Sequence, residues 1–482
     1  MRNTIAIVGG GFCGTVLAAN LLRSPPAAAT DIVLIERGGE MGRGVAYAER
    51  DYPYLLNVPA LRLSADSADP LQFLRFAQRR MPQAEGEDFL PRALYGEYLQ
   101  DALVRAEREA PPHARLQRIF GEVRRVTPRA SDNRLTAQFA DRPPITADRV
   151  ILALGNPPPP PHPWAEAVGG HSAYRQDPWN LPKTLGSEHS VMIIGNGLTM
   201  VDVASALTRG TKGSPQLYTI SRHGLIPQPQ TSFRATEVLG DRAAFLACGG
   251  STRRLLTMAR ELARKVEREG GDWREAVTFL RHLAPPLWRR LSAAEQRRFL
   301  RHLRTHWDTH RHRIPPQVGD LIAGLRRDGK LRVNAGRIES IEPQGEQLRV
   351  AWRAREGEAA AVTVDLVVNA TGPDYMLKRS ADPLLSWLRE AGLIVEDALN
   401  LGLRTGQYGA CLDAQGRVSE TLYYLGPMLR ADHWEATAAT ELRDHAERLA
   451  AHLTGNLTGN LTENRPEAQP AWPRPGAYDN SP

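Results

Sequence analysis

A glycine-rich turn close to the N-terminus constrains the fold of this chain more than any other feature. The apolar run TIAIV at residues 4–8 predicts a buried strand, and Gly9-Gly10-Gly11-Phe12-Cys13-Gly14 follows it directly. In Gly9-x-Gly11-x-x-Gly14, the first glycine makes a tight turn and the second lets a pyrophosphate approach the backbone. The third lets the helix pack closely on the strand. Unpaired N–H groups at the start of that helix would then face the diphosphate.

The segments after this turn complete one β-turn-α-β unit. Residues 15–23 predict a helix, and residues 31–36 (DIVLIE) predict the next strand. Glu36 ends that strand, where a carboxylate receives the ribose hydroxyls of a bound dinucleotide. The two strands and the acid together favour a nucleotide site over a purely structural glycine turn.

A second unit of the same kind begins at residue 190. The strand SVMII at 190–194 leads into Gly195-Asn196-Gly197-Leu198-Thr199, then a helix, then the strand QLYTI at 216–220. Met200 replaces the third glycine, which alters helix packing but leaves the phosphate-binding glycines in place. We predict that this turn binds NAD(P) through Gly195, Gly197 and Thr199.

The second unit has no acid at the end of its second strand, where Ser221 and Arg222 stand instead. These two side chains favour the 2′-phosphate of NADPH. Arg222 stacked on adenine would accept NADH as well, so the sequence leaves both nucleotides open.

Further turns indicate that the first nucleotide is FAD. A Gly-rich stretch and an LLNVPA run follow Glu36-Arg37, as is common where a flavin lies extended along the domain. Ala153-Leu154-Gly155 and Ala370-Thr371-Gly372 predict turns that pass close to the cofactor. Gly426 precedes a helix expected at 434–453, whose N-terminus would face the flavin. The residues predicted to contact FAD are Gly9, Gly11, Phe12, Cys13, Gly14, Glu36, Arg37, Gly44, Asn57, Gly155, Thr371, Gly372 and Gly426.

These motifs predict an α/β fold with two Rossmann-type dinucleotide-binding domains, for FAD and for NAD(P), and a helical insertion. We assign residues 1–189 and 331–453 to the FAD-binding domain and residues 190–330 to the NAD(P)-binding domain. The helical insertion spans about 235–316, where strand signals vanish and helical spacing takes over. Residues 454–482 are polar and rich in proline, which predicts a disordered tail.

Within the insertion, His302, His306 and His310 are spaced i, i+4, i+8, which predicts one shared helix face. We favour a solvated basic face there over the lining of a substrate or NADP pocket, and over a metal site, and we predict no bound metal.

Composition narrows the class of protein. The net charge of +7 favours an ordinary arginine-rich composition over nucleic-acid or membrane binding. Cys13, Cys248 and Cys411 form no C-x-x-C pair, which argues against a dithiol reductase. No run of 18 apolar residues occurs. We therefore expect a cytoplasmic protein whose partners are a small-molecule substrate and O2; the sequence leaves its oligomeric state open.

The motifs follow a familiar order over residues 3–450. They are GGGFCG, GRGVAY, LLNVPA, PRALYGEYL, GNGLTMVD, SRHGL, HRHRIPP, ATGPDY and LGPMLRADHWEATAATELR. In these motifs the chain resembles the FAD–NAD(P)-binding flavoproteins related to the N-hydroxylating monooxygenases. Met200 matches the pattern of that family. The chain also looks similar overall to a branch that contains a urate hydroxylase.

The resemblance implies a monooxygenase. NAD(P)H would reduce FAD, the reduced flavin would capture O2 as a C4a-hydroperoxide, and a hydroxyl group would pass to the substrate. The most specific expectation is hydroxylation of urate to 5-hydroxyisourate in purine catabolism. Arg62 and Arg313 would then hold the anion, with Asn57 and Gln317 as amide donors. The alternatives are N-hydroxylation of an amine, a flavin dehydrogenase, and a flavin redox sensor or partner-binding module without turnover.

Overall fold

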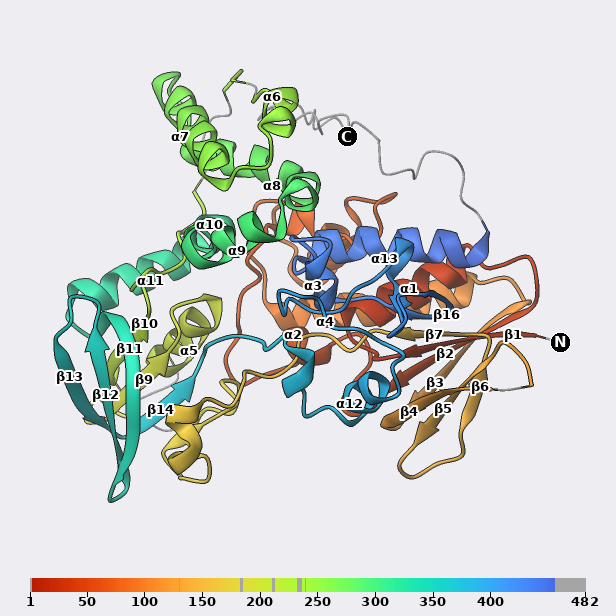
Figure 1. Ribbon diagram of the computed structural model, residues 1–482, viewed down its shortest axis with the longest axis horizontal. Helices are drawn as coiled ribbons and strands as arrows, with labels where there is room; N and C mark the ends of the chain where they lie inside the picture. The colour runs from red at the N-terminus through yellow and green to blue at the C-terminus, as the bar shows by residue number, and fades with distance from the viewer. Residues whose placement is uncertain are drawn as a thin grey trace.

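The computed structural model describes residues 2–129, 131–182, 185–209, 213–231, 236–238 and 240–455. Two α/β lobes lie side by side, and a group of helices covers the junction between them (Figure 1). The predicted tail lies outside the described residues from Asn456 onward.

The first lobe is built on a six-stranded sheet of order β15-β16-β7-β1-β2-β3. Residues alternate between its two faces, as the twofold period of a strand requires. Ile5 and Ile7 of β1 pack with α1, α4 and α13, while Ala6 and Val8 pack on the other side with α12. The strands are β1 (Asn3–Val8), β2 (Thr30–Glu36), β3 (Ala114–Phe120), β7 (Arg149–Leu152), β15 (Ala410–Leu412) and β16 (Val418–Tyr424). The helices are α1 (Phe12–Arg23), α4 (Arg92–Glu109), α12 (Pro383–Glu390) and α13 (Ala439–Thr454).

A small antiparallel sheet, which the sequence interpretation did not include, covers part of the second face. It consists of β4 (Val123–Pro128), β5 (Leu135–Phe139) and β6 (Ile145–Ala147). Its buried side chains, among them Val126 and Ala137, belong to the same core cluster as Ala6 and Val8.

The second lobe is built on a seven-stranded sheet of order β13-β12-β11-β10-β9-β14-β8. Its strands are β8 (Tyr174–Arg175), β9 (Ser190–Ile194), β10 (Gln216–Ser221), β11 (Leu331–Gln344), β12 (Gln347–Ala354), β13 (Ala359–Val364) and β14 (Leu366–Asn369). β10 pairs in parallel with β11, and β14 pairs in parallel with β9. The predicted return to the first domain at residue 331 is therefore wrong, because the chain finishes the second sheet before it leaves this lobe at Asn369.

The insertion is helical and lies within the crossover from β10 to β11. Its helices are α6 (Arg242–Ala247), α7 (Thr252–Arg268), α8 (Trp273–Arg290), α9 (Ala293–His302) and α10 (Arg304–Arg311). Four of the five begin at an Asp or Ser whose side chain accepts a backbone N–H of the first turn: Asp241, Ser251, Asp272 and Ser292. The following helix α11 (Pro316–Arg327) already packs on the second lobe, against α5 (Leu198–Arg209).

The predicted shared face of His302, His306 and His310 is not formed. α9 ends at His302, and a new helix begins after Leu303, so the histidine spacing does not run along one helix. The ring of His310 packs against Trp273, 5.0 Å away. The described residues contain no group of three or more His, Cys, Asp or Glu that could hold a metal ion. Among the described helices, none combines the length and the apolar character needed to cross a bilayer.

The closing helix begins later than the sequence predicts. The predicted start was about Trp434, whereas α13 starts at Ala439. Trp434 and Glu435 are almost fully buried, and Trp434 packs on Trp288 of the insertion, with ring centroids 4.7 Å apart. We attribute the later start to these tertiary contacts, which hold the preceding segment in a turn.

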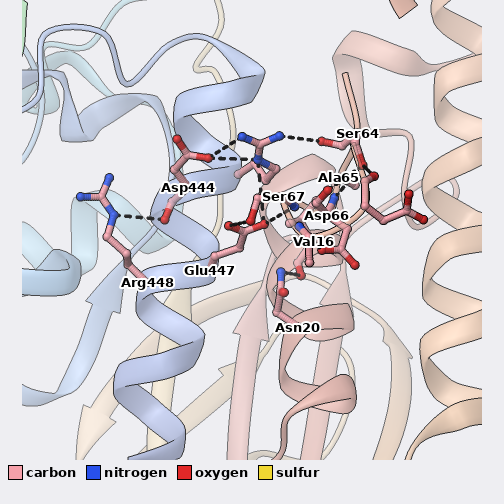
Figure 2. A network of polar contacts seen from close by, with 12 residues as sticks. Val16, Asn20, Ser64, Ala65, Asp66, Ser67, Asp444, Glu447 and Arg448 are labelled. Carbon is pink, nitrogen blue, oxygen red and sulfur yellow. Dashed lines mark hydrogen bonds and ion pairs between the residues drawn. The ribbon is translucent and has the colours of Figure 1, made fainter. Parts of the chain in front are cut away.

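Helix α13 is fastened to the first lobe by a polar network (Figure 2). Glu447 accepts hydrogen bonds from the backbone N–H and the hydroxyl of Ser67, at 2.9 and 2.7 Å. Arg443 pairs with Asp444 and donates to the carbonyl of Ser64. These contacts fix the helix that follows the predicted flavin-facing segment.

We predict that Gly14→Ala lowers the free energy of unfolding by about 3 kcal/mol or more, because an added Cβ would lie 1.9 Å from the carbonyl oxygen of Gly9. Chemical denaturation with circular dichroism measures this change. Gly170→Ala is the matched control, since a Cβ there meets nothing within 4 Å. Equal midpoints for the two variants would contradict the packing seen at the first turn.

Candidate nucleotide and substrate sites

The first glycine turn leaves no room for side chains where strand β1 ends. Gly9 has φ +112°, and a Cβ there would lie 2.2 Å from the carbonyl oxygen of Ala153 at the end of β7. The first hydrogen bond of α1 runs from the N–H of Thr15 to the carbonyl of Gly11. The N–H groups of Phe12, Cys13 and Gly14 precede that bond and are suited to a phosphate.

Glu36 lies beside this turn, as predicted. Its two carboxylate oxygens accept the N–H groups of Gly10 and Gly38, at 2.8 and 3.0 Å. Gly44 lies against the turn, because a Cβ on it would come within 3.2 Å of the Gly11 Cα. This arrangement fits the ribose and diphosphate of FAD, with the carboxylate held in place before the cofactor binds.

The other residues predicted to contact FAD differ in their exposure and in the space around them. Arg37 is exposed and forms an ion pair at 3.1 Å with Asp382, the N-cap residue of α12. Burial raises the pKa of the Cys13 thiol to about 12, so this residue offers its backbone N–H and not a thiolate. Gly155 turns with φ +72° beside open space, while a Cβ on Gly426 would lie 2.8 Å from the Tyr424 hydroxyl.

The second glycine turn repeats the construction of the first. Gly195 has φ +107°, and a Cβ there would lie 2.3 Å from the carbonyl oxygen of Ala370 at the end of β14. The first hydrogen bond of α5 runs from Val201 to Gly197. Thr371 and Gly372 therefore lie at the second turn. In the second sheet β14 pairs with β9 as β7 pairs with β1 in the first, so these two residues lie at a different turn from Gly9, and their contact with FAD stays a prediction.

Asn196 in the second turn indicates a ligand. Its side-chain oxygen and nitrogen are buried and have no hydrogen-bond partner within the described part of the chain. An unpaired buried amide costs free energy, which a bound nucleotide would recover. Met200 is fully buried in the core of this lobe, so α5 accommodates a large side chain where α1 has Gly14.

Two arginines converge at the end of β10. Arg222 follows Ser221 directly, and Arg355 is brought alongside by its backbone hydrogen bond to Ala335, the neighbour of Ser221 in the sheet. Burial, followed by the charges of Arg355 and Arg222, lowers the pKa of His223. The site is cationic and exposed, which fits a 2′-phosphate. Sequence reasoning missed Arg355 because it comes from a hairpin more than a hundred residues away.

Asn57 lies where the two lobes meet, at a small cavity between a first-lobe loop and helices α5 and α11. Gln317 is exposed on the first turn of α11, between two of the lining residues. The cavity is lined by Tyr52, Tyr54, Leu55, Asn57, Val201, Asp202, Ser205, Pro315 and Val318.

Arg313 lies close to this junction, two residues before Pro315 of the cavity lining, and its guanidinium is in an unusual environment. Its Nε and Nη1 atoms are buried and find no hydrogen-bond partner among the described residues. Burial lowers its pKa to about 10, and the charges of Arg274, Arg311 and Arg62 act in the same direction. The structure thus brings the two predicted anion-binding residues, Arg62 and Arg313, within electrostatic reach of each other.

The neighbours of Arg313 have carboxylate partners of their own. Arg274 pairs with Asp272 at 2.8 Å, and Arg311 pairs with the buried Glu435 at 2.9 Å. The second pair also attaches the insertion to the segment before α13. A guanidinium with buried, unpaired N–H groups in such a cluster is suited to receive an anionic group of a ligand.

Comparisons with known proteins agree with this architecture. Residues 6–157 match the family model described as FAD-NAD(P)-binding. An uncharacterised Escherichia coli protein, YdhS, is 26% identical over 216 residues, which are 42% of this chain and 39% of that protein. The chain therefore spans well under half of the length of this curated relative.

Solved structures resemble the chain over nearly its whole length. Ornithine hydroxylase from Pseudomonas aeruginosa aligns with a TM-score of 0.61 at 15% identity, covering 95% of this chain and 100% of that one. The FAD-bound cadaverine monooxygenase of Erwinia amylovora gives 0.59 at 14% identity, covering 94% and 95%. The ornithine N-hydroxylase of Kutzneria, with reduced FAD, NADP+ and L-ornithine, gives 0.57 at 15%, covering 95% and 100%.

At these identities the structural matches establish the fold. Residues 6–157, in the first lobe, match an FAD-NAD(P)-binding family, and the chain as a whole has the two-lobed fold of the ornithine and cadaverine hydroxylases named above.

Proposed function

We propose that this chain is an FAD-dependent, NADPH-consuming monooxygenase that N-hydroxylates a primary amine on a small molecule carrying a carboxylate. In the reaction, one atom of O2 enters the hydroxylamine and the other leaves as water. NADPH supplies a hydride and solvent supplies a proton, so atoms and electrons balance. The observation that carries the choice of substrate is at Arg313, whose buried Nε and Nη1 atoms have no hydrogen-bond partner among the described residues.

The charge around Arg313 favours an amine that also carries a carboxylate over a simple diamine. At Arg313 the charges of Arg274, Arg311 and Arg62 outweigh the opposing charge of Asp272, so an ammonium group is repelled and a carboxylate is attracted. An amino acid with a side-chain amine fits better than a simple diamine such as cadaverine. Urate is also an anion, but the similar structures named above act on ornithine or cadaverine and lend the urate expectation no support.

The residues of this chain have distinct tasks in this proposal. When bound, FAD supplies hydride acceptance and oxygen activation. The N–H groups after Gly11 hold its diphosphate and Glu36 receives its ribose, while the turn at Gly195 holds the nicotinamide nucleotide. Asn57 and Arg313 orient the substrate where the lobes meet. The insertion covers that region and keeps water out.

A screen of the purified, FAD-loaded protein tests the function. NADPH and O2 consumption are followed with L-ornithine, L-lysine, cadaverine and urate, and the hydroxylamine product is measured by mass spectrometry. We expect coupled hydroxylamine formation with an amino acid. Product from urate alone would refute N-hydroxylation. Flavin that neither NADH nor NADPH reduces would favour the sensor without turnover.

We predict that Arg313→Gln raises the KM for the anionic substrate about 10- to 100-fold, because it removes charge-assisted hydrogen bonds of about 1.5–3 kcal/mol. Flavin reduction by NADPH stays near the wild-type rate. The melting temperature does not fall, because the variant also removes an unpaired buried charge. Steady-state kinetics and calorimetry measure these effects. Arg326→Gln, on the exposed surface of α11, is the control, and a lowered melting temperature with unchanged KM would indicate a structural role.

We predict that Arg222→Ala raises the KM for NADPH about 10-fold or more and leaves that for NADH nearly unchanged, because only NADPH carries the 2′-phosphate. A double variant with Arg355→Ala loses the remaining preference. Initial rates with both nucleotides measure the effect. Arg327→Ala, an exposed arginine of the same lobe, serves as the control. Equal losses for both nucleotides would place Arg222 against the adenine instead.

A further inference from the structure

A largely buried ion pair joins the two lobes directly. Arg92, the first residue of α4, contacts Asp202 in α5 through two parallel hydrogen bonds. They run from Nη1 to Oδ2 at 2.8 Å and from Nη2 to Oδ1 at 3.0 Å. The two side chains are 15% and 14% exposed. This bidentate geometry fixes orientation as well as distance, which a single contact between point charges does not.

On the first lobe, Arg92 is held at several other points. Its backbone N–H donates to the carbonyl of Tyr54 at 2.7 Å, and its Nε donates to the carbonyl of Leu55 at 2.9 Å. The guanidinium lies 5.7 Å from the Tyr54 ring centroid, and Trp179 packs edge-on against that ring. The guanidinium is therefore in a fixed position before it meets the second lobe.

On the second lobe, Asp202 belongs to the helix that starts at the nucleotide turn. It comes one helical turn after Leu198, whose N–H group precedes the first hydrogen bond of α5. Any rotation of α5 would carry the turn at Gly195 and Gly197 with it. The ion pair thus connects α4 of the FAD lobe to the helix that receives the second nucleotide.

The energetics favour a geometric role for this pair. Two charges withdrawn from water pay a desolvation cost, so a buried pair contributes little net stability, and apolar residues of similar volume often serve as well. What such a pair does supply is one defined arrangement of the parts that it joins. Val201 and Ser205 of the same helix line the cavity opposite Asn57, so that arrangement also shapes the junction.

We propose that Arg92 and Asp202 are positioning residues that set α5, and with it the nicotinamide nucleotide, at the distance from the flavin that hydride transfer requires. This inference rests on the proposed function. Neither side chain takes part in the transfer itself. Loss of the pair leaves both nucleotide turns intact and allows the lobes to shift relative to each other.

The test combines Asp202→Asn, Arg92→Lys and the exchanged double variant Arg92→Asp/Asp202→Arg in the full-length, FAD-loaded protein. Anaerobic stopped-flow with NADPH gives the limiting rate of flavin reduction and the apparent Kd separately. Hydrogen exchange with mass spectrometry measures protection of α5 and of residues 52–57. Asp31→Asn is the control, because its pair with Arg2, at 2.8 Å, lies within the first lobe.

We expect the limiting reduction rate of both single variants to fall about 10- to 100-fold, since small displacements of reacting groups have effects of that size. Kd stays within about twofold of wild type, and exchange increases only at α5 and residues 52–57. The exchanged variant recovers part of the rate. Arg92→Lys keeps the charge, so it provides the measurement if Asp202→Asn does not fold.

Two outcomes overturn the proposal. One is an unchanged reduction rate in variants whose exchange at α5 has increased, which would mean that the pair only stabilises the junction. The other is exchange at the junction equal to that of wild type. If nicotinamides do not reduce the wild-type flavin, the proposed function fails, while hydrogen exchange still shows whether the pair holds the lobes together.

Discussion

In both lobes a glycine lies against the backbone carbonyl of an alanine on the neighbouring strand, and the rest of the architecture depends on that contact. Gly9 meets Ala153, and Gly195 meets Ala370, with no space for a Cβ at either glycine. The contact brings the end of one strand, the start of the helix that follows it and the end of the neighbouring strand to one edge of each sheet. Each lobe thereby presents unpaired N–H groups where a nucleotide diphosphate fits.

The helical insertion contributes the excess of positive charge that the two nucleotide lobes lack. Residues 241–313 contain 17 Arg and Lys against 8 Asp and Glu, a net charge of +9 that exceeds the +7 of the whole chain. The excess of positive over negative charge is thus concentrated there, although basic residues occur along the whole sequence. Glu435 and Asp272 pair with Arg311 and Arg274, whereas Nε and Nη1 of Arg313 find no partner among the residues that the structure describes. A charge that costs stability and serves no internal partner points to a ligand.

Much of the fold could be predicted because it depends on local sequence patterns. Apolar runs ended by glycines indicated both β-turn-α-β units, and loss of strand periodicity indicated the insertion. The errors occurred where the structure of a segment depends on pairing or packing with residues far away in the sequence. The strands between residues 331 and 369 were recognised from their sequence, but the sheet that they join depends on their hydrogen-bonding partners, which lie in the second lobe. The segment before Ala439 has helical composition, yet burial of Trp434 against the insertion keeps it out of α13.

By itself, the sequence determined the two nucleotide turns, because each is set by neighbouring residues whose backbone angles and sterics leave few alternatives. It also supplied Arg62 and Arg313 as anion-binding candidates through a family resemblance. Only the tertiary structure decided that Nε and Nη1 of Arg313 are buried without a partner in the described part of the chain, that Arg355 joins Arg222, and that Arg92 meets Asp202. Those features depend on which side chains meet across more than a hundred residues, and no local spacing encodes such meetings.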